Sequence, residues 1–131
     1  MKHKGSVSDV QRTRDILIYE LYLQLRKSRR YDCLQQICRV ISTMKQKQHY
    51  ISYERGCWLY YHYFTHGKMP YRNKWKHKVY MSFLRSCERI KSADNKLRKK
   101  DIVWRAIESE ADCIGLGPSQ IYKVLKAKGA K

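Results

Sequence analysis

The sequence has little that would break a helix and no segment suited to spanning a membrane. It contains two prolines and six glycines among 131 residues. Its longest uncharged apolar run, residues 57–64, covers less than half of the ~20 residues that a transmembrane helix needs. No apolar stretch follows the basic residues at the N-terminus, as it would in a secretory signal. We therefore expect a cytoplasmic protein with no membrane segment.

Acidic residues are scarce relative to basic ones. The chain has 11 Asp and Glu against 29 Lys and Arg, which gives a formal net charge of +18. Hydrophobic residues make up 43% of the chain, which argues against a disordered basic tail. The usual partner of a folded domain with this charge is a polyanion, most often DNA or RNA.

Motifs for catalysis and metal binding are also missing. The sequence has no glycine-rich phosphate loop and no serine nucleophile elbow, and its carboxylates are scattered. The five cysteines are odd in number and lack C-x-x-C spacing, which predicts reduced core thiols. His62 and His66 are spaced i, i+4 after Cys57, but the other candidate ligands, Cys33 and Cys38, lie on or beside an apolar stripe. We expect no enzyme activity, no metal and no cofactor.

Apolar residues recur at helical spacing along the chain, and no segment alternates with a period of two. Ser8 and Ser52 are suited to capping two of the helices. The pattern predicts helices at about residues 8–27, 32–45, 52–64, 73–91, 101–113 and 118–129. We therefore predict an all-α fold, a compact bundle of about six helices in a single domain of residues 1–131.

The last predicted helix is short and clearly delimited. Pro118 suits the first helical position, and Leu116 and Ile121 have the spacing of a hydrophobic staple. Gly129 stands where a left-handed residue ends a helix. A helix therefore follows the turn that contains Gly115.

Residues 107–126 resemble the helix-turn-helix family of DNA-binding units. The family has a small residue on its first helix, a glycine four residues later, and apolar residues six and nine positions beyond the glycine. Those places hold Ala111, Gly115, Ile121 and Val124. The resemblance implies that residues 101–131 form a C-terminal helix-turn-helix unit beside a helical core of residues 1–91.

The second helix of this unit would read DNA with its outward face. Gln pairs with adenine, Lys with guanine or phosphate, and Tyr or Ser with phosphate. The candidate contact residues are Ser119, Gln120, Tyr122, Lys123 and Lys126. The alternative is a helical hairpin that closes the bundle and carries solvated lysines.

The middle of the chain is its most basic part. Residues 66–100 carry 12 basic and 2 acidic groups. Such a segment is expected to contact nucleic-acid phosphates without reading sequence. In this segment the expected phosphate contacts are Arg72, Lys74, Lys76 and Lys78. Arg55, in the preceding predicted helix, is expected to contribute another nucleic-acid contact.

Aromatic residues crowd the third predicted helix. Trp58, Tyr60, Tyr61 and Tyr63 cannot all share one helical face. Either the helix packs on two sides as part of the core, or some rings form a second nucleic-acid surface. Segments 32–66 and 101–129 also show a loose parallel, since each has a helix, a connector and a capped helix.

These features together favour a sequence-preferring DNA-binding protein. In size and charge the chain looks like the small transcriptional regulators and recombination accessory factors of phages and mobile elements. Both a monomer and a homo-oligomer are compatible with this interpretation. An RNA-binding or ribonucleoprotein subunit is one alternative, and a helical protein–protein adaptor with an acidic partner is another.

Overall fold

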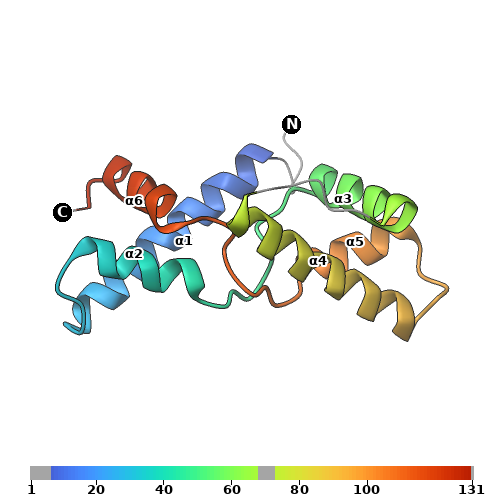
Figure 1. The fold of residues 1–131 in the computed structure, drawn as a ribbon, viewed down its shortest axis with the longest axis horizontal. Helices are drawn as coiled ribbons and strands as arrows, with labels where there is room; N and C mark the ends of the chain where they lie inside the picture. The colour runs from blue at the N-terminus through green and yellow to red at the C-terminus, as the bar shows by residue number, and fades with distance from the viewer. Residues whose placement is uncertain (1–6, 68–72, 131) are drawn as a thin grey trace.

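The computed structural model describes residues 7–67 and 73–130, and within these ranges it contains six α-helices and no strand. The all-α prediction is confirmed. The helices are α1 (Val7–Lys27), α2 (Leu34–Thr43), α3 (Tyr53–His66), α4 (Lys74–Ala93), α5 (Lys99–Ile107) and α6 (Pro118–Ala127), shown in Figure 1. None of them carries an apolar stretch that could cross a lipid bilayer.

Several predicted helix-end residues have the expected local structure. The Ser52 hydroxyl accepts the backbone N–H of Arg55 and so caps α3, as expected. Pro118 is the first residue of α6, and Gly129 has the left-handed φ of 87° expected of a residue that ends a helix. The prediction for Ser8 is wrong, because α1 begins at Val7 and Ser8 lies inside it.

The six helices form two lobes, each with its own hydrophobic core. In the first lobe α1, α2 and α6 pack against one another, and in the second lobe α3, α4 and α5 do so (Figure 1). The first core consists of Ile18, Tyr22, Ile37, Cys38, Ile41, Ile114, Ile121, Leu125 and Ala130. The second consists of Ile51, Leu59, Val79, Tyr80, Phe83, Leu84, Cys87, Ile102, Val103, Ala106, Ile107 and Cys113.

The last two helices do not pack against each other, although both are fully described. α5 ends at Ile107 rather than near residue 113, and an irregular connector, residues 108–117, leads to α6. α6 packs on α1 and α2, where it buries Ile121 and Leu125 completely. Each of these side chains contributes roughly 1.5–3 kcal/mol relative to exposure. The helix-turn-helix predicted for residues 107–126 is therefore not a packed pair of consecutive helices.

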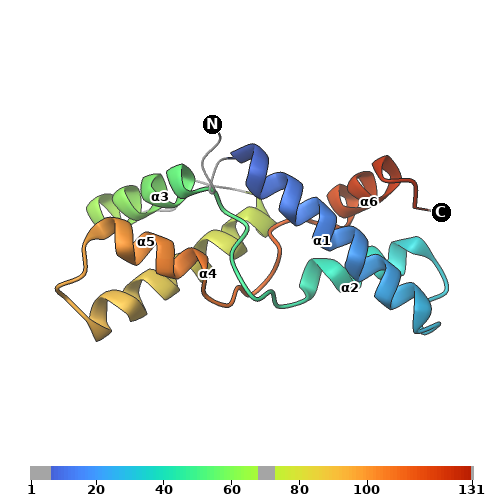
Figure 2. The same ribbon diagram turned by 180° about the vertical axis from the view of Figure 1, so that it is seen from behind.

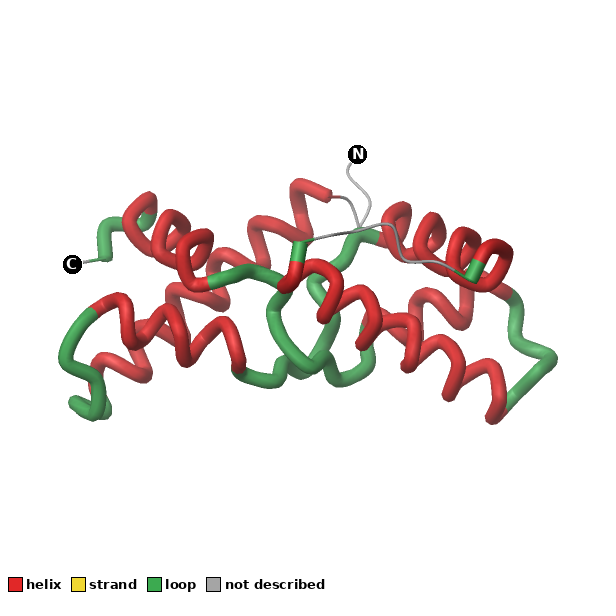
Figure 3. Tube along the Cα trace, viewed as in Figure 1, coloured by secondary structure: helices red, strands yellow, loops and turns green. Residues whose placement is uncertain are grey.

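The two connectors that join the lobes cross at the centre of the molecule. Residues 44–52 run from α2 to α3, and residues 108–117 run from α5 to α6, as Figure 3 shows in green. Where they meet, Gln46 and Ala111 exchange two backbone hydrogen bonds, with N···O distances of 2.9 and 2.8 Å. Ala111 thus joins the two connectors. The helix-turn-helix resemblance implies a position where two helices cross, and this expectation is wrong.

Positions 65 residues apart in the sequence have equivalent places in the two lobes. Gln46 pairs with Ala111 across the centre, and Ser52 and Gly117 are the N-caps of α3 and α6. The same spacing relates buried residues of the two cores: Ile18 to Phe83, Tyr22 to Cys87, Ile37 to Ile102 and Cys38 to Val103.

A half-turn exchanges the lobes. Figure 2 shows α3, α5 and α4 in the places that α6, α2 and α1 occupy in Figure 1. The parallel between residues 32–66 and 101–129 therefore extends to α1 and α4, and the halves α1–α2–α3 and α4–α5–α6 are equivalent. Each half places its third helix in the lobe built by the other half.

Three of the five thiols lie in the cores. Cys38, Cys87 and Cys113 are buried and free, and burial raises the pKa of the Cys87 thiol to about 12. A thiol with this pKa stays protonated and packs as a small apolar group. Cys33 is exposed, so the expectation of a core thiol is wrong there.

Candidate nucleic-acid interface

The predicted contact residues of α6 occupy its outer face. Ser119, Gln120, Lys123 and Lys126 are all exposed, on the side opposite the buried residues of the helix. Tyr122 is different, because it is half-buried and its ring lies 5.6 Å from the ammonium nitrogen of Lys126. α6 therefore offers a row of amide, hydroxyl and ammonium groups to solvent.

A basic hollow lies at the middle of the molecule, where the first turns of α1, α3 and α4 converge. Its volume is about 170 Å³, and its wall includes Arg14 from α1, Arg55 from α3 and Lys76 from α4. Tyr50 and Tyr80 also line it. The structure thus brings together two predicted phosphate contacts, Arg55 and Lys76, from helices that are distant in sequence.

The electrostatics of this hollow favour an anion. Among its described lining residues there is no Asp or Glu, although Arg14 also contacts the carboxylate of its neighbour Asp15 at 3.1 Å. Residues from the first turns of α1, α3 and α4 line the hollow, so it lies near the partial positive charge of three helix N-termini. Three basic side chains around one hollow suit a phosphate group.

The three lysines predicted on α4 do not share one side of the helix. Lys74 and Lys78 are four residues apart and lie on one side, while Lys76 lines the central hollow. Arg72 lies outside the described residues. Arg14 was missed at the sequence level, because its role depends on the long-range packing of α1 beside α3 and α4.

The aromatic helix α3 divides its rings between core and surface. Tyr60 and Tyr63 pack against the second core, whereas Trp58 is 37% and Tyr61 52% exposed. The exposed rings are flanked by cations: the guanidinium carbon of Arg55 lies 5.3 Å from the Trp58 ring centroid, and the ammonium nitrogen of Lys99 lies 5.6 Å from that of Tyr61. α3 therefore packs part of its aromatic surface in the core and exposes the rest, and nucleic-acid binding by the exposed rings stays a prediction.

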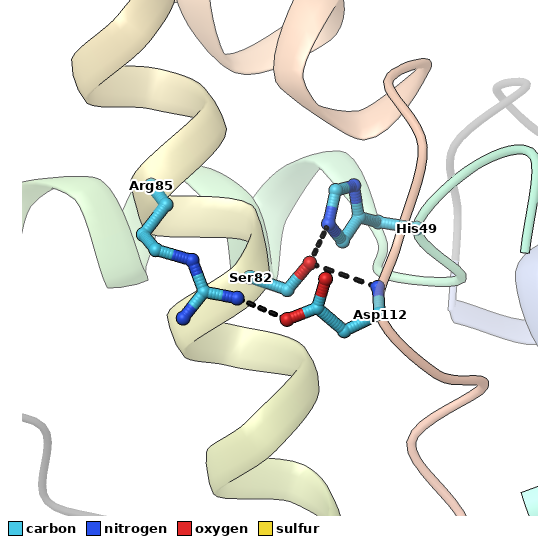
Figure 4. A network of polar contacts seen from close by, with 4 residues as sticks. All are labelled: His49, Ser82, Arg85 and Asp112. Carbon is cyan, nitrogen blue, oxygen red and sulfur yellow. Dashed lines mark hydrogen bonds and ion pairs between the residues drawn. The ribbon is translucent and has the colours of Figure 1, made fainter. Parts of the chain in front are cut away.

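A buried polar network fixes the connectors to α4, as Figure 4 shows. His49 Nδ1 donates to the Ala106 carbonyl at 2.8 Å, and Nε2 accepts from the Ser82 hydroxyl at 2.9 Å. The Ser82 oxygen in turn accepts the backbone N–H of Asp112, whose carboxylate contacts Arg85. Burial lowers the pKa of His49, so the ring stays neutral in this arrangement.

The hydrogen bond between Ser82 and His49 resembles that between a nucleophile and its base, but the surroundings of the pair do not fit this role. Both side chains are almost fully buried, and the second ring nitrogen of His49 bonds a backbone carbonyl instead of a carboxylate. The network therefore links the two connectors to each other through Ser82 of α4.

His62 and His66 lie one turn apart on α3. Their ring centroids are 5.7 Å apart, and the described residues contain no cluster of three or more potential metal ligands. Each ring instead belongs to the aromatic surface of α3, since Trp58 lies 4.1 Å from His62 and Tyr61 lies 6.2 Å from His66, measured between centroids.

Comparisons of the chain with models of protein families, with curated proteins and with solved structures gave no match.

Proposed function

We propose that the chain is a sequence-preferring DNA-binding protein that uses α6 and the central basic hollow. The observation that carries the proposal is their placement. α6 and the first turns of α1, α3 and α4 lie along the same long edge of the molecule (Figures 1 and 2). One duplex lying along this edge could contact both.

The two parts of this surface suit different groups of DNA. Gln120, Lys123 and Lys126 project from one side of a straight helix, and a major groove is wide enough to admit a helix. Arg14, Arg55 and Lys76 surround a hollow of a size that suits a phosphate group. The first part would supply sequence preference and the second would supply affinity.

Parallel titrations of duplex DNA, single-stranded DNA and structured RNA at two salt concentrations test the proposal. With six to ten phosphate contacts, duplex affinity should fall about 10³–10⁵-fold between about 50 and 200 mM salt. Failure to bind any nucleic acid at low salt would contradict the proposal and favour an adaptor with an acidic protein partner.

RNA binding is the second candidate, and the exposed rings of α3 support it. Trp58 and Tyr61, flanked by Arg55 and Lys99, could stack on unpaired bases. In this case structured RNA or single strands would bind more tightly than duplex DNA in the same titrations. Tyr61→Ala would then weaken the binding of single strands.

A further inference from the structure

We infer that α3 is a second DNA-reading helix equivalent to α6, and that the chain binds a two-part duplex site in one fixed orientation. This inference rests on the proposed function, which assigns DNA reading to α6 alone.

The outer faces of α3 and α6 correspond position by position. Exposed residues of α3 stand 65 positions before exposed residues of α6, in the same order along the helix. The pairs are Glu54 with Ser119, Arg55 with Gln120, Trp58 with Lys123, and Tyr61 with Lys126. All eight side chains are exposed. If the outer face of α6 contacts a duplex, the outer face of α3 is therefore exposed at the equivalent place of the other lobe.

The buried faces correspond in the same way. Ile121 and Leu125 seat α6 on the first core, and the residues 65 positions earlier, Gly56 and Tyr60, seat α3 on the second. A Cβ at Gly56 would lie only 3.0 Å from a Val103 methyl, so α3 sits very close to α5. The two helices are thus held in equivalent orientations by different side chains.

The arrangement of these helices matches the symmetry of a duplex. α3 and α6 lie at opposite ends of one long edge, and the central hollow lies between them (Figures 1 and 2). DNA-binding dimers use a two-fold axis to place two reading helices on successive parts of a duplex. Here one chain supplies both helices, and the hollow is placed to hold the intervening backbone.

The two reading faces differ chemically, so the two parts of the site should differ in sequence. On α6, Gln120 suits adenine and Lys123 suits guanine or phosphate. On α3, Glu54 suits the amino group of cytosine, while the Trp58 and Tyr61 rings offer apolar contact to a thymine methyl group. A dimer of identical chains reads a palindrome, but this chain would read an asymmetric site and so bind in one direction.

Selection from a random duplex library by the full chain tests the inference. We expect a site with two unlike sequence motifs at constant spacing. Two pairs of variants at symmetry-related positions assign the motifs: Trp58→Ala and Tyr61→Ala on α3, and Lys123→Ala and Lys126→Ala on α6. Each variant should lower the preference for the motif of its own helix about 5- to 150-fold, the equivalent of about 1–3 kcal/mol for one base contact, and leave the other motif unchanged.

Arg105→Ala, at an exposed position of α5, is the control for a general loss of surface charge. It should change neither motif, and circular dichroism should show that all five variants keep the helicity of the parent chain. Tyr61→Ala carries the test if Trp58→Ala disturbs folding, because Tyr61 is the more exposed of the two.

Four results would overturn the inference. A single selected motif that only the α6 variants alter would leave the proposed function standing but remove α3 from base reading. The same follows if the α3 variants weaken all duplexes equally, since α3 would then contact only the backbone, or if they affect only RNA. The absence of any duplex binding by the parent chain would overturn the inference and the proposed function together.

Discussion

Buried polar side chains of this chain gather where the two connectors cross. His49, Gln46 and Ser82 are all buried in this region, and His49 and Ser82 hydrogen-bond each other. At the position equivalent to His49, the other half of the chain has Ile114, which lies in the apolar first core. The two halves therefore differ at this position. One has a buried titratable side chain, and the other has an apolar one.

His49 should make stability depend on pH. Burial lowers its pKa below the unfolded value of about 6.5, so the unfolded state binds the proton more readily. The contribution of the neutral ring is complete above about pH 6.5 and is lost as the pH falls toward the folded-state pKa, with a slope of up to about 1.4 kcal/mol per pH unit. Urea unfolding between pH 7.5 and 5 measures this slope.

Comparison of two histidine variants isolates the effect. His49→Gln should be less stable than the parent at pH 7.5 and should lose much of the slope. His77→Gln, at an exposed position of α4, should keep the slope of the parent chain. An unchanged slope in His49→Gln would show that other groups cause the pH dependence.

Gly115 should be intolerant of any side chain, for two independent reasons. Its φ of 87° is strained for other residues, by about 1–2 kcal/mol. An added Cβ would also lie 2.8 Å from a methyl carbon of Val79, and overpacking of this kind costs about 1–3 kcal/mol. We expect Gly115→Ala to lower the free energy of unfolding by about 2–5 kcal/mol, as measured by chemical denaturation.

Gly129 is the matched control because it has the same φ of 87° and open space around it. Gly129→Ala should cost only the strain, about 1–2 kcal/mol. Equal losses in the two variants would contradict the contact with Val79.

Among the helices, α4 links the candidate interface to the core. Its buried face holds Phe83 and Cys87 in the second core, and its first turn places Lys76 at the central hollow. Asn73 fixes the start of this turn, because its side chain accepts the backbone N–H groups of Trp75 and Lys76. The helix therefore presents Lys76 from a rigid support.

Lys76 should contribute one phosphate contact to DNA binding. Lys76→Gln should weaken binding to preferred and random duplexes alike, and should reduce the slope of log affinity against log salt by about one. The control is Lys96→Gln, since Lys96 is exposed in the turn between α4 and α5, at the end of the second lobe farthest from the hollow. A slope that changes equally in both variants would show that binding follows net charge and not position.

Local sequence signals predicted the helices well and failed where contacts are long-range. Ser52, Pro118 and Gly129 act on neighbouring backbone, so their roles could be deduced from spacing. The end of α5 was predicted too late, because Ala111 and Cys113 extend the apolar pattern but are buried in the connector. Ala111 pairs with Gln46 of the other connector and Cys113 packs in the second core, and these contacts are distant in the sequence.

In the candidate site, too, local features could be predicted from the sequence and long-range contacts could not. The outer face of α6 could be predicted from helical spacing, because Ile121 and Leu125 define the opposite face. The hollow could not, since Arg14, Arg55 and Lys76 come from three helices that meet only in the folded chain. The loose parallel between two segments was the one sequence feature that pointed toward the symmetry.

At the scale of the whole molecule, the exchanged third helices make the two halves depend on each other. α1 and α2 pack with α6 of the second half, and α4 and α5 pack with α3 of the first. Without α6, the first core loses Ile121 and Leu125, and a small helical pair has little else to bury. The exchange has the topology of a domain-swapped dimer formed within one chain.

This topology predicts that fragments 1–67 and 68–131 fold together and not alone. Each fragment by itself should show weak helicity, because its third helix has no core to pack on and isolated short helices are marginal in water. An equimolar mixture should recover the circular dichroism of the intact chain and elute as a one-to-one complex. Ile121→Asp in the second fragment should prevent this recovery, whereas Lys123→Asp, on the exposed side of the same helix, should permit it. If either fragment alone folds as a monomer with native-like helicity, its third helix can return to its own half, and the exchange is not required for folding.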